Sequence, residues 1–129
     1  MNKKLQIAGA FFGATAVVLG AFGAHGLENV LEADAIATFE TGVTYQFYHA
    51  FLLLLVSLFA LSEKTKKYIF WLLIIGILCF SGSIYLLATN ALTGFDFKVI
   101  FWVTPLGGTL LIFAWVLLFI NFFKKKADN

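Results

Sequence analysis

A chain of 129 residues has the length of one domain, but 61% of its residues are hydrophobic and only 12% are charged, about half the charged share of soluble domains. So few charges cannot cover a water-exposed surface, and the composition excludes an ordinary soluble fold. The net charge of +2 includes no basic stripe or nucleic-acid motif, so no nucleic-acid partner is expected.

Four apolar segments are long enough to cross a bilayer, because a hydrocarbon core needs roughly 20 helical residues. They cover residues 5–24, 44–61, 68–89 and 99–123. None alternates polar and apolar residues in the manner of membrane β-strands. The sequence therefore predicts an all-α fold, a membrane-spanning four-helix bundle that forms one transmembrane domain over residues 1–129.

The first segment, residues 5–24, follows two lysines, a pattern that also fits a signal peptide. We interpret it as the first membrane helix, because its removal would leave three helices and break the charge distribution of the chain. Small residues recur on one face at spacings of three and four: Gly9, Gly13, Ala16, Gly20 and Gly23. Such a face favours close helix contact, either within the bundle or, alternatively, in a homo-oligomer.

Residues 25–43 form the longest predicted connection. Asn29 and Glu32 have the spacing of a capping pair, which together with nearby apolar residues predicts a short amphipathic helix on the membrane surface. Asp34 has the residue type of an N-cap for a helix that continues into the second span. A helix from Asp34 to Ser62 would be longer than a bilayer core, so its first turns should project or tilt.

The second segment continues a stripe of mainly polar and aromatic residues that begins in the preceding turns. At about 100° per residue its members share one side of a helix: Asp34, Thr38, Thr41, Tyr45, Tyr48, His49 and Leu52. Polar side chains that enter lipid should face the bundle interior, where hydrogen-bonding partners exist. We therefore expect this stripe to face inward, and Glu40, on the opposite side, to be solvated.

The last two segments add polar and small residues to the half of the bundle that contains the polar part of the second segment. Ser81 and Tyr85 lie four residues apart in the third segment. In the fourth, Pro105 either starts the helix or kinks it, and the adjacent Gly107 and Gly108 predict close packing.

The lysines predict the orientation of the bundle. Residues 62–67 form a short predicted turn, so the second and third helices should be antiparallel neighbours. Eight of the nine basic residues then lie on one side: Lys3, Lys4, Lys64, Lys66, Lys67, Lys124, Lys125 and Lys126. By the positive-inside rule that side is cytoplasmic, which predicts that both termini are inside.

The polar side chains of the outer half form the candidate ligand-binding site: His25, Thr41, Tyr45, Tyr48, His49, Ser81 and Tyr85. For His49, a hydrogen-bonded structural role is one interpretation, and ligand or proton binding is another. A metal site that includes His25 lacks the usual ligand spacing, so neither a metal nor a cofactor is predicted. The chain contains no catalytic motif, and no enzyme activity is expected.

Five strings occur in an order typical of a known family: GAFGAHGL at 20–27, FETGV at 39–43, YQFYHA at 45–50, FSGSIYL at 80–86 and TPLGG at 104–108. The chain resembles the small bacterial membrane proteins of domain-of-unknown-function family 423, which are related to a eukaryotic transmembrane protein. The resemblance implies a four-helix, multi-pass protein of the bacterial plasma (inner) membrane. It singles out His25, Glu40, Tyr45, Gln46, His49, Ser81, Tyr85 and Pro105 as motif positions, but it implies no activity.

Two functional hypotheses remain open at the level of sequence. The first is a membrane protein that binds a small molecule, a lipid headgroup or a proton in an outward-facing polar pocket around Tyr45, His49 and Tyr85. The second is a structural or assembly module that packs as a homo-oligomer, or with partner subunits, through its glycine faces.

Overall fold

The computed structural model describes residues 1–125, and within them the chain forms helices and no strands. The helical elements are α1 (Asn2–Ala21), the π-helical η1 (Phe22–Gly26), α2 (Ala33–Leu58), α3 (Glu63–Ile77), the π-helical η2 (Leu78–Gly82), α4 (Ser83–Ala88), the 3-10 turns η3 (Asn90–Leu92) and η4 (Phe97–Ile100), and α5 (Val103–Lys124). They join into four spans that are long and apolar enough to cross a membrane: Asn2–Gly26, Ala33–Leu58, Glu63–Ala88 and Phe97–Lys124. The predicted all-α, four-span architecture is confirmed.

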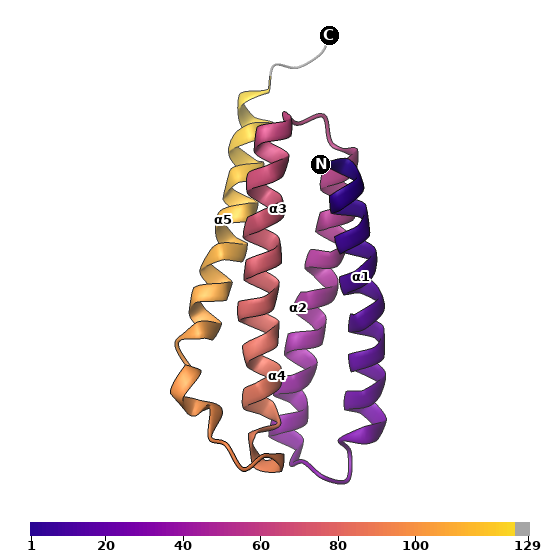
Figure 1. Cartoon of the computed structure of the whole chain (residues 1–129), viewed down its shortest axis with the longest axis vertical. Helices are drawn as coiled ribbons and strands as arrows, with labels where there is room; N and C mark the ends of the chain where they lie inside the picture. The colour runs from indigo at the N-terminus through magenta and orange to yellow at the C-terminus, as the bar shows by residue number, and fades with distance from the viewer. Residues whose placement is uncertain (126–129) are drawn as a thin grey trace.

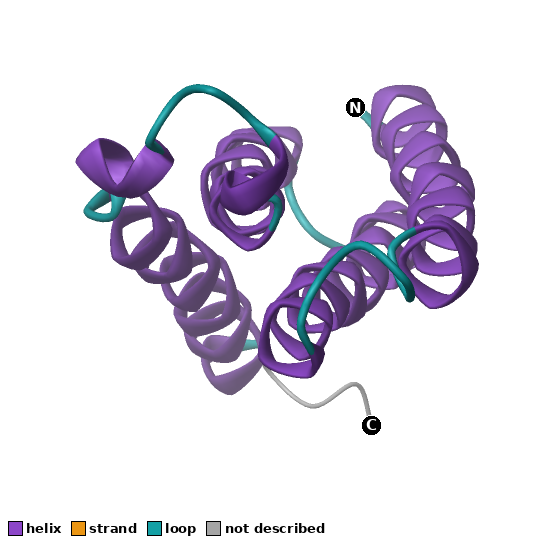
Figure 2. Cartoon of the chain, turned by 90° about the horizontal axis from the view of Figure 1, so that it is seen from below, coloured by secondary structure: helices purple, strands orange, loops and turns teal. Residues whose placement is uncertain are grey.

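The spans run antiparallel to their chain neighbours, so α1 begins at the same end of the molecule where α5 ends (Figure 1). The most extensive helix pairs are α1 with α2 and α3 with α5, and α2 also packs along the span formed by α3, η2 and α4. Helix α2 and the span formed by α3, η2 and α4 are the central pair. Seen end-on, α1 and α5 lie at the two flanks of this central pair (Figure 2). The bundle is therefore wide, and α1 and α5 do not pack against each other.

The two ends of the bundle differ in charge. One end, called the lysine-rich end below, carries Lys3, Lys4, Lys64, Lys66, Lys67, Lys124 and Lys125. The other, called the acidic end, carries Glu28, Glu32, Asp34, Glu40, Asp96 and Lys98. Lys126 belongs to the predicted lysine cluster but lies outside the described residues.

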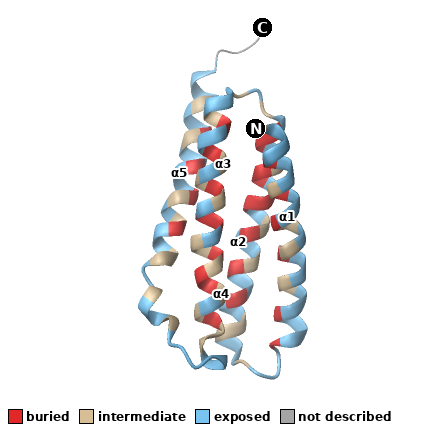
Figure 3. Ribbon diagram, in the orientation of Figure 1, coloured by how far each residue is buried: buried red, intermediate tan, exposed pale blue. Residues whose placement is uncertain are grey.

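Burial follows the inner faces of the helices (Figure 3). The largest apolar cluster includes the fully buried Leu5, Leu53, Ile69 and Leu73, contributed by α1, α2 and α3. The outer faces expose large apolar side chains, with Phe119 on α5 67% exposed. Water would oppose so much exposed apolar surface, whereas a hydrocarbon environment does not.

Helix α2 begins at Ala33, close to the start at Asp34 predicted for a helix that continues into the apolar segment 44–61, and it ends at Leu58 rather than at 61. The predicted connection 25–43 shrinks to a turn over residues 27–32, so the prediction of an amphipathic surface helix was wrong. Glu32, not Asp34, occupies the N-cap position, and its side chain makes no capping hydrogen bond. The added turns are stabilised by burial of Phe39, which hydropathy alone does not reveal because exposed acidic residues flank it.

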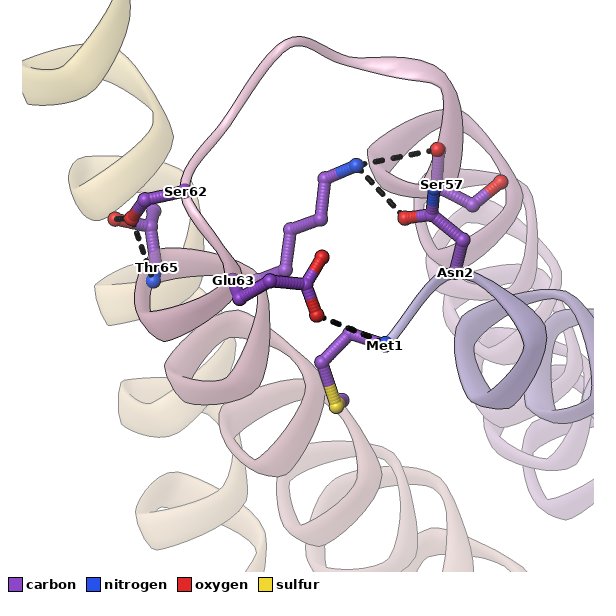
Figure 4. A network of polar contacts seen from close by, with 7 residues as sticks. Met1, Asn2, Ser57, Ser62, Glu63 and Thr65 are labelled. Carbon is purple, nitrogen blue, oxygen red and sulfur yellow. Dashed lines mark hydrogen bonds and ion pairs between the residues drawn. The ribbon is translucent and has the colours of Figure 1, made fainter.

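The turn between α2 and α3 covers residues 59–62 instead of 62–67. It ends early because the Ser62 hydroxyl accepts a hydrogen bond of 3.1 Å from the Thr65 amide and caps α3 (Figure 4). The lysines assigned to the turn therefore lie in the first turns of α3.

Lys66 is a buried member of the lysine cluster, at 4% exposure. Its ammonium donates to Asn2 Oδ1 at 2.7 Å and to the Ser57 carbonyl at 3.3 Å. Beside it, Glu63 accepts a hydrogen bond of 3.0 Å from the Met1 amino group (Figure 4). Because the last carbonyls of a helix lack partners within it, Lys66 stabilises the end of α2 and joins it to α1 and α3.

The glycine face of the first span, formed by α1 and η1, is turned toward α2 of the same chain. A Cβ atom on Gly9 would lie 2.8 Å from the Leu54 side chain, and one on Gly23 would lie 2.8 Å from the Phe39 ring. Gly20 faces Val43 at 3.3 Å, while Gly13 has more room. Helix α2 of the same chain therefore covers Gly9 and Gly23, while Gly13 and Gly20 are only partly buried.

Helix α5 begins at Val103, so Pro105 lies in its first turn, where a missing amide hydrogen costs no intrahelical bond. Just beyond it, Gly107 meets the backbone of η2: an added Cβ would overlap Phe80 N and lie 2.7 Å from the Cys79 carbonyl carbon. At Gly108 the nearest atom, on the Phe80 ring, is 3.5 Å away, an ordinary contact.

Substitution of Gly107 by alanine should lower the free energy of unfolding by about 1–3 kcal/mol, because the obstructing atoms belong to the backbone and cannot rotate away. Gly108→Ala is the matched control, and its better helix propensity should leave it neutral or slightly stabilised. Thermal unfolding of the detergent-purified proteins, followed by circular dichroism, measures both. Equal stability of the two variants would contradict the close α5–η2 contact.

Candidate functional site

The predicted ligand-binding residues do not form one pocket. Thr41, Tyr45 and His49 line a groove between α2 and α5. Ser81 and Tyr85 instead hydrogen-bond to the neighbouring face of α2, in the interior of the bundle. Tyr48 is 58% exposed and lines no part of the groove, and His25 is exposed in η1 near the acidic end.

The polar stripe predicted on α2 does not coincide with the buried face of that helix. The buried face runs through Phe39, Gly42, Gln46, His49 and Leu53. Of the predicted stripe only His49 and Leu52 are buried, while its first five members are exposed. Two of these, Thr38 and Thr41, donate their hydroxyl hydrogens to the carbonyls four residues earlier, at 3.0 and 3.1 Å. A threonine satisfied in this way does not need the bundle interior.

The groove between α2 and α5 has a volume of ≈ 430 Å³, within the range of small-molecule sites. Its lining comprises Thr41, Tyr45, His49, Phe80, Gly108, Leu111, Ile112 and Trp115. Ile112 and Trp115 are 61% and 50% exposed, so the groove opens sideways from the bundle, where the lipid of a membrane would lie. An apolar molecule in the bilayer could therefore enter without crossing a polar barrier.

His49 holds the two walls of the groove together. Its Nδ1 lies 2.6 Å from the Tyr45 carbonyl, and its Nε2 lies 3.1 Å from the indole nitrogen of Trp115 on α5. A carbonyl only accepts and an indole N–H only donates, so the imidazole is neutral with its proton on Nδ1. Both ring nitrogens are thus used inside the protein, which favours the structural interpretation of His49 over metal or proton binding.

Among the polar residues of the groove, Tyr45 has a hydroxyl group that is available as a hydrogen-bond donor. Its ring packs edge-on against Phe80, with 5.2 Å between centroids, and is 42% exposed. Its hydroxyl forms no hydrogen bond with any group in residues 1–125. The hydroxyl of Thr41 is occupied by the Ala37 carbonyl, so a molecule in the groove would meet one phenolic donor among apolar walls.

A second polar feature is a buried junction centred on Gln46, which is 4% exposed. Its amide nitrogen donates to the Phe12 carbonyl at 2.9 Å and to Thr15 Oγ1 at 2.8 Å. The Tyr85 hydroxyl donates to the Gln46 carbonyl oxygen at 2.6 Å. One side chain therefore connects α1, α2 and α4.

Sequence reasoning did not assign Gln46, Thr15 or Trp115 to the site. A signal was available for Gln46, which belongs to a motif string and places an amide inside a membrane span. Thr15 and Trp115 carry no such signal, because each acquires its role from a partner distant in sequence.

The π-helical segment η2 is fastened to α2 by Ser81, whose hydroxyl donates to the Gly42 carbonyl at 2.7 Å. Helix α2 lies close to α4 at this point, because a Cβ atom on Gly42 would lie 2.7 Å from the Tyr85 ring. On the next turn, the hydroxyls of Ser83 and Thr104 are within 2.5 Å of each other and join α4 to α5. Ser81 thus acts in helix packing here.

Within residues 1–125, no group of three or more His, Cys, Asp and Glu side chains could hold a metal ion. Cys79, the one cysteine, is half-buried on η2.

Comparison with known proteins places this architecture in a family. The family described as "Protein of unknown function (DUF423)" matches residues 19–108, which include the groove residues on α2 as well as Gln46 and Tyr85 of the buried junction. The chain belongs to this family. Its description names no activity, so membership does not assign one.

Bacterial relatives cover nearly the whole chain. A UPF0382 membrane protein of Haemophilus influenzae is 43% identical over 98% of both chains. Another, from Staphylococcus saprophyticus, is 41% identical over 95% of this chain and 98% of its own length. The UPF0382 membrane protein YwdK of Bacillus subtilis is 36% identical over 92% and 94%. No solved structure matches the chain. These names and the four apolar spans identify a multi-pass membrane protein.

The Gln46 junction should show energetic coupling. Gln46→Leu leaves the Tyr85 hydroxyl without its acceptor, and Tyr85→Phe leaves the Gln46 oxygen without its donor, so each should cost roughly 1–2 kcal/mol. The double variant should cost clearly less than the sum. Unfolding by dodecyl sulfate titration measures the cycle. Tyr45→Phe, the same chemical change at a hydroxyl with no partner, should have little effect, and additive Gln46 and Tyr85 effects would contradict the junction.

Proposed function

We propose that the chain binds a small amphipathic molecule, drawn laterally from the bilayer, in the groove between α2 and α5. The observation that carries this proposal is the Tyr45 hydroxyl, which lies without a protein partner beside apolar walls. A hydroxyl in hydrocarbon is stabilised by any acceptor it can reach. The molecule should therefore combine an apolar body with a carbonyl or ether oxygen.

The depth of Tyr45 in the span supports this assignment. Helix α2 has 26 residues, which at about 1.5 Å each gives about 39 Å, against roughly 30 Å of hydrocarbon. Tyr45 lies about 18 Å from the first residue, Ala33. Even if the whole excess length projects at the acidic end, the backbone of Tyr45 lies about 9 Å inside the hydrocarbon.

The proposal is narrower than the polar pocket expected from the sequence. Tyr85 and Ser81 serve the bundle interior, and His49 is held by the Tyr45 carbonyl and Trp115. What remains for a ligand is a donor from Tyr45, the aromatic rings of Phe80 and Trp115, and aliphatic walls. These groups favour a neutral ring-containing or branched molecule over an ion.

Benzophenone is a suitable probe, because its ketone accepts a hydrogen bond and its photoexcited state inserts into nearby C–H bonds. With the protein in nanodiscs, mass spectrometry should map labelling to the groove residues Leu111 and Ile112. Tyr45→Phe should reduce the labelling between about twofold and tenfold, the value of one hydrogen bond. Gly108→Leu should abolish it by filling the groove.

Tyr48→Phe is the matched control, since Tyr48 is a phenol on the same helix that lines no part of the groove. Its labelling should equal that of the wild type. Labelling that is spread evenly over the outer faces, or that survives both Tyr45→Phe and Gly108→Leu, would refute binding in this groove.

The charge distribution supports the further proposal that the lysine-rich end faces the cytoplasm. In a Cys79→Ala background, Glu32→Cys should react with a membrane-impermeant maleimide in intact cells, whereas Lys64→Cys should react only after permeabilisation. Both reporter positions are exposed, which makes Lys64 a better choice than the buried Lys66. Reaction of both cysteines from the same side would contradict the orientation.

A further inference from the structure

A second groove, separate from the proposed ligand site, lies between α1 and α3 in the lysine-rich half. It has a volume of ≈ 340 Å³ and is lined by Lys4, Ile7, Ala8, Phe11, Phe12, Phe70 and Ile74. Apart from Lys4 at its mouth, every lining residue is apolar. Ile7 and Phe11 are each 60% exposed, so this groove is also open toward the surroundings of the bundle.

Both walls carry a lysine one turn nearer the end of the bundle than the apolar lining. On α1, Lys4 precedes Ile7 and Ala8 at the spacing of one helical turn. On α3, Lys67 is exposed and lies three residues before Phe70, which places it on the same face as the lining. The groove is thus apolar along its length and basic at its mouth.

The neighbouring charges leave these two lysines available. Lys66 is turned inward and bound to Asn2 and Ser57, and the Lys64 ammonium lies 5.9 Å from the centre of the Tyr68 ring. The nearby carboxylate of Glu63 is paired with the Met1 amino group at 3.0 Å. Lys4 and Lys67 form no hydrogen bond or ion pair within residues 1–125, so the basic group on each wall of the groove is available at its mouth.

We propose that this groove binds an anionic phospholipid, with its phosphate between Lys4 and Lys67 and one acyl chain along the apolar walls. From Lys4 to Phe12 the wall extends about 12 Å along α1, enough to hold roughly the first half of an acyl chain. Charge complementarity selects the headgroup, because a zwitterionic phospholipid carries its own cation to compete with the lysines. The remainder of the lipid stays in the bilayer.

The test compares lipids that share acyl chains but differ in headgroup. Native mass spectrometry of the detergent-purified protein should show more bound phosphatidylglycerol than phosphatidylcholine at equal concentration. Each lysine near a charged lipid surface contributes about fivefold to affinity. Lys4→Gln combined with Lys67→Gln should therefore weaken phosphatidylglycerol binding roughly twentyfold and remove most of the headgroup preference.

The control removes the same amount of charge from the same end of the molecule but outside the groove, by Lys64→Gln with Lys124→Gln. This pair should retain the preference within about twofold. An equal loss in both pairs would show a general attraction of the lysine-rich end and would overturn the proposal, as would the absence of any preference in the wild type.

A third variant tests the acyl chain. Ala8→Leu extends a side chain into the groove without changing the charge and should lower phosphatidylglycerol retention several-fold. Circular dichroism verifies its helix content, and if it fails to fold, the two lysine pairs still decide. Unchanged retention in a folded Ala8→Leu variant would show that the chain does not lie in the groove. None of these results depends on Tyr45, so this proposal and the proposed function can fail independently.

Discussion

Inside a membrane, a polar group that finds no partner in the protein finds none in the solvent, and this constraint explains the placement of the polar side chains. Within residues 1–125, no buried side-chain nitrogen or oxygen lacks a hydrogen bond. Gln46 satisfies its amide with groups from two other helices, α1 and α4, and His49 uses both ring nitrogens. The Tyr45 hydroxyl is exposed and lies outside this rule for buried groups. Among the polar groups that line the groove it is the one without a partner in residues 1–125, which leaves it free to meet a ligand.

Those hydrogen bonds depend on close approach of backbones. Ser81 reaches the Gly42 carbonyl because the α2 and α4 spans meet where a Cβ would overlap the Tyr85 ring. Gly107 brings α5 against the backbone of η2 in the same way. In lipid there is little hydrophobic force between helices, so dispersion contacts and hydrogen bonds at such crossings hold the bundle together. The small residues of the motif strings let the helices approach closely, and the polar residues form hydrogen bonds at the same crossings. Both sets therefore stabilise the contacts between helices.

Much of this architecture could be predicted from the sequence, because length and hydropathy alone indicate four spans and the lysines mark their ends. The sequence could not predict which polar residues face the groove and which face the bundle interior. Tyr45 and Gln46 are adjacent, yet about 100° of helical rotation sends one to the groove and the other to the interior. Which of them is buried depends on where α1 and α4 pack, a tertiary property. The burial of Lys66 also depends on partners distant in sequence.

The two grooves share an origin in the helix arrangement. Helices α1 and α5 flank the central pair without meeting, so α1 diverges from α3 on one side and α5 diverges from α2 on the other. What distinguishes the grooves is the polar group that each presents. A phenol within the hydrocarbon can donate a hydrogen bond to a neutral acceptor, but it cannot stabilise an ion there. A lysine at the border keeps its charge and selects an anion. One bundle can therefore present a site for a neutral molecule and a site for a charged lipid without the two competing.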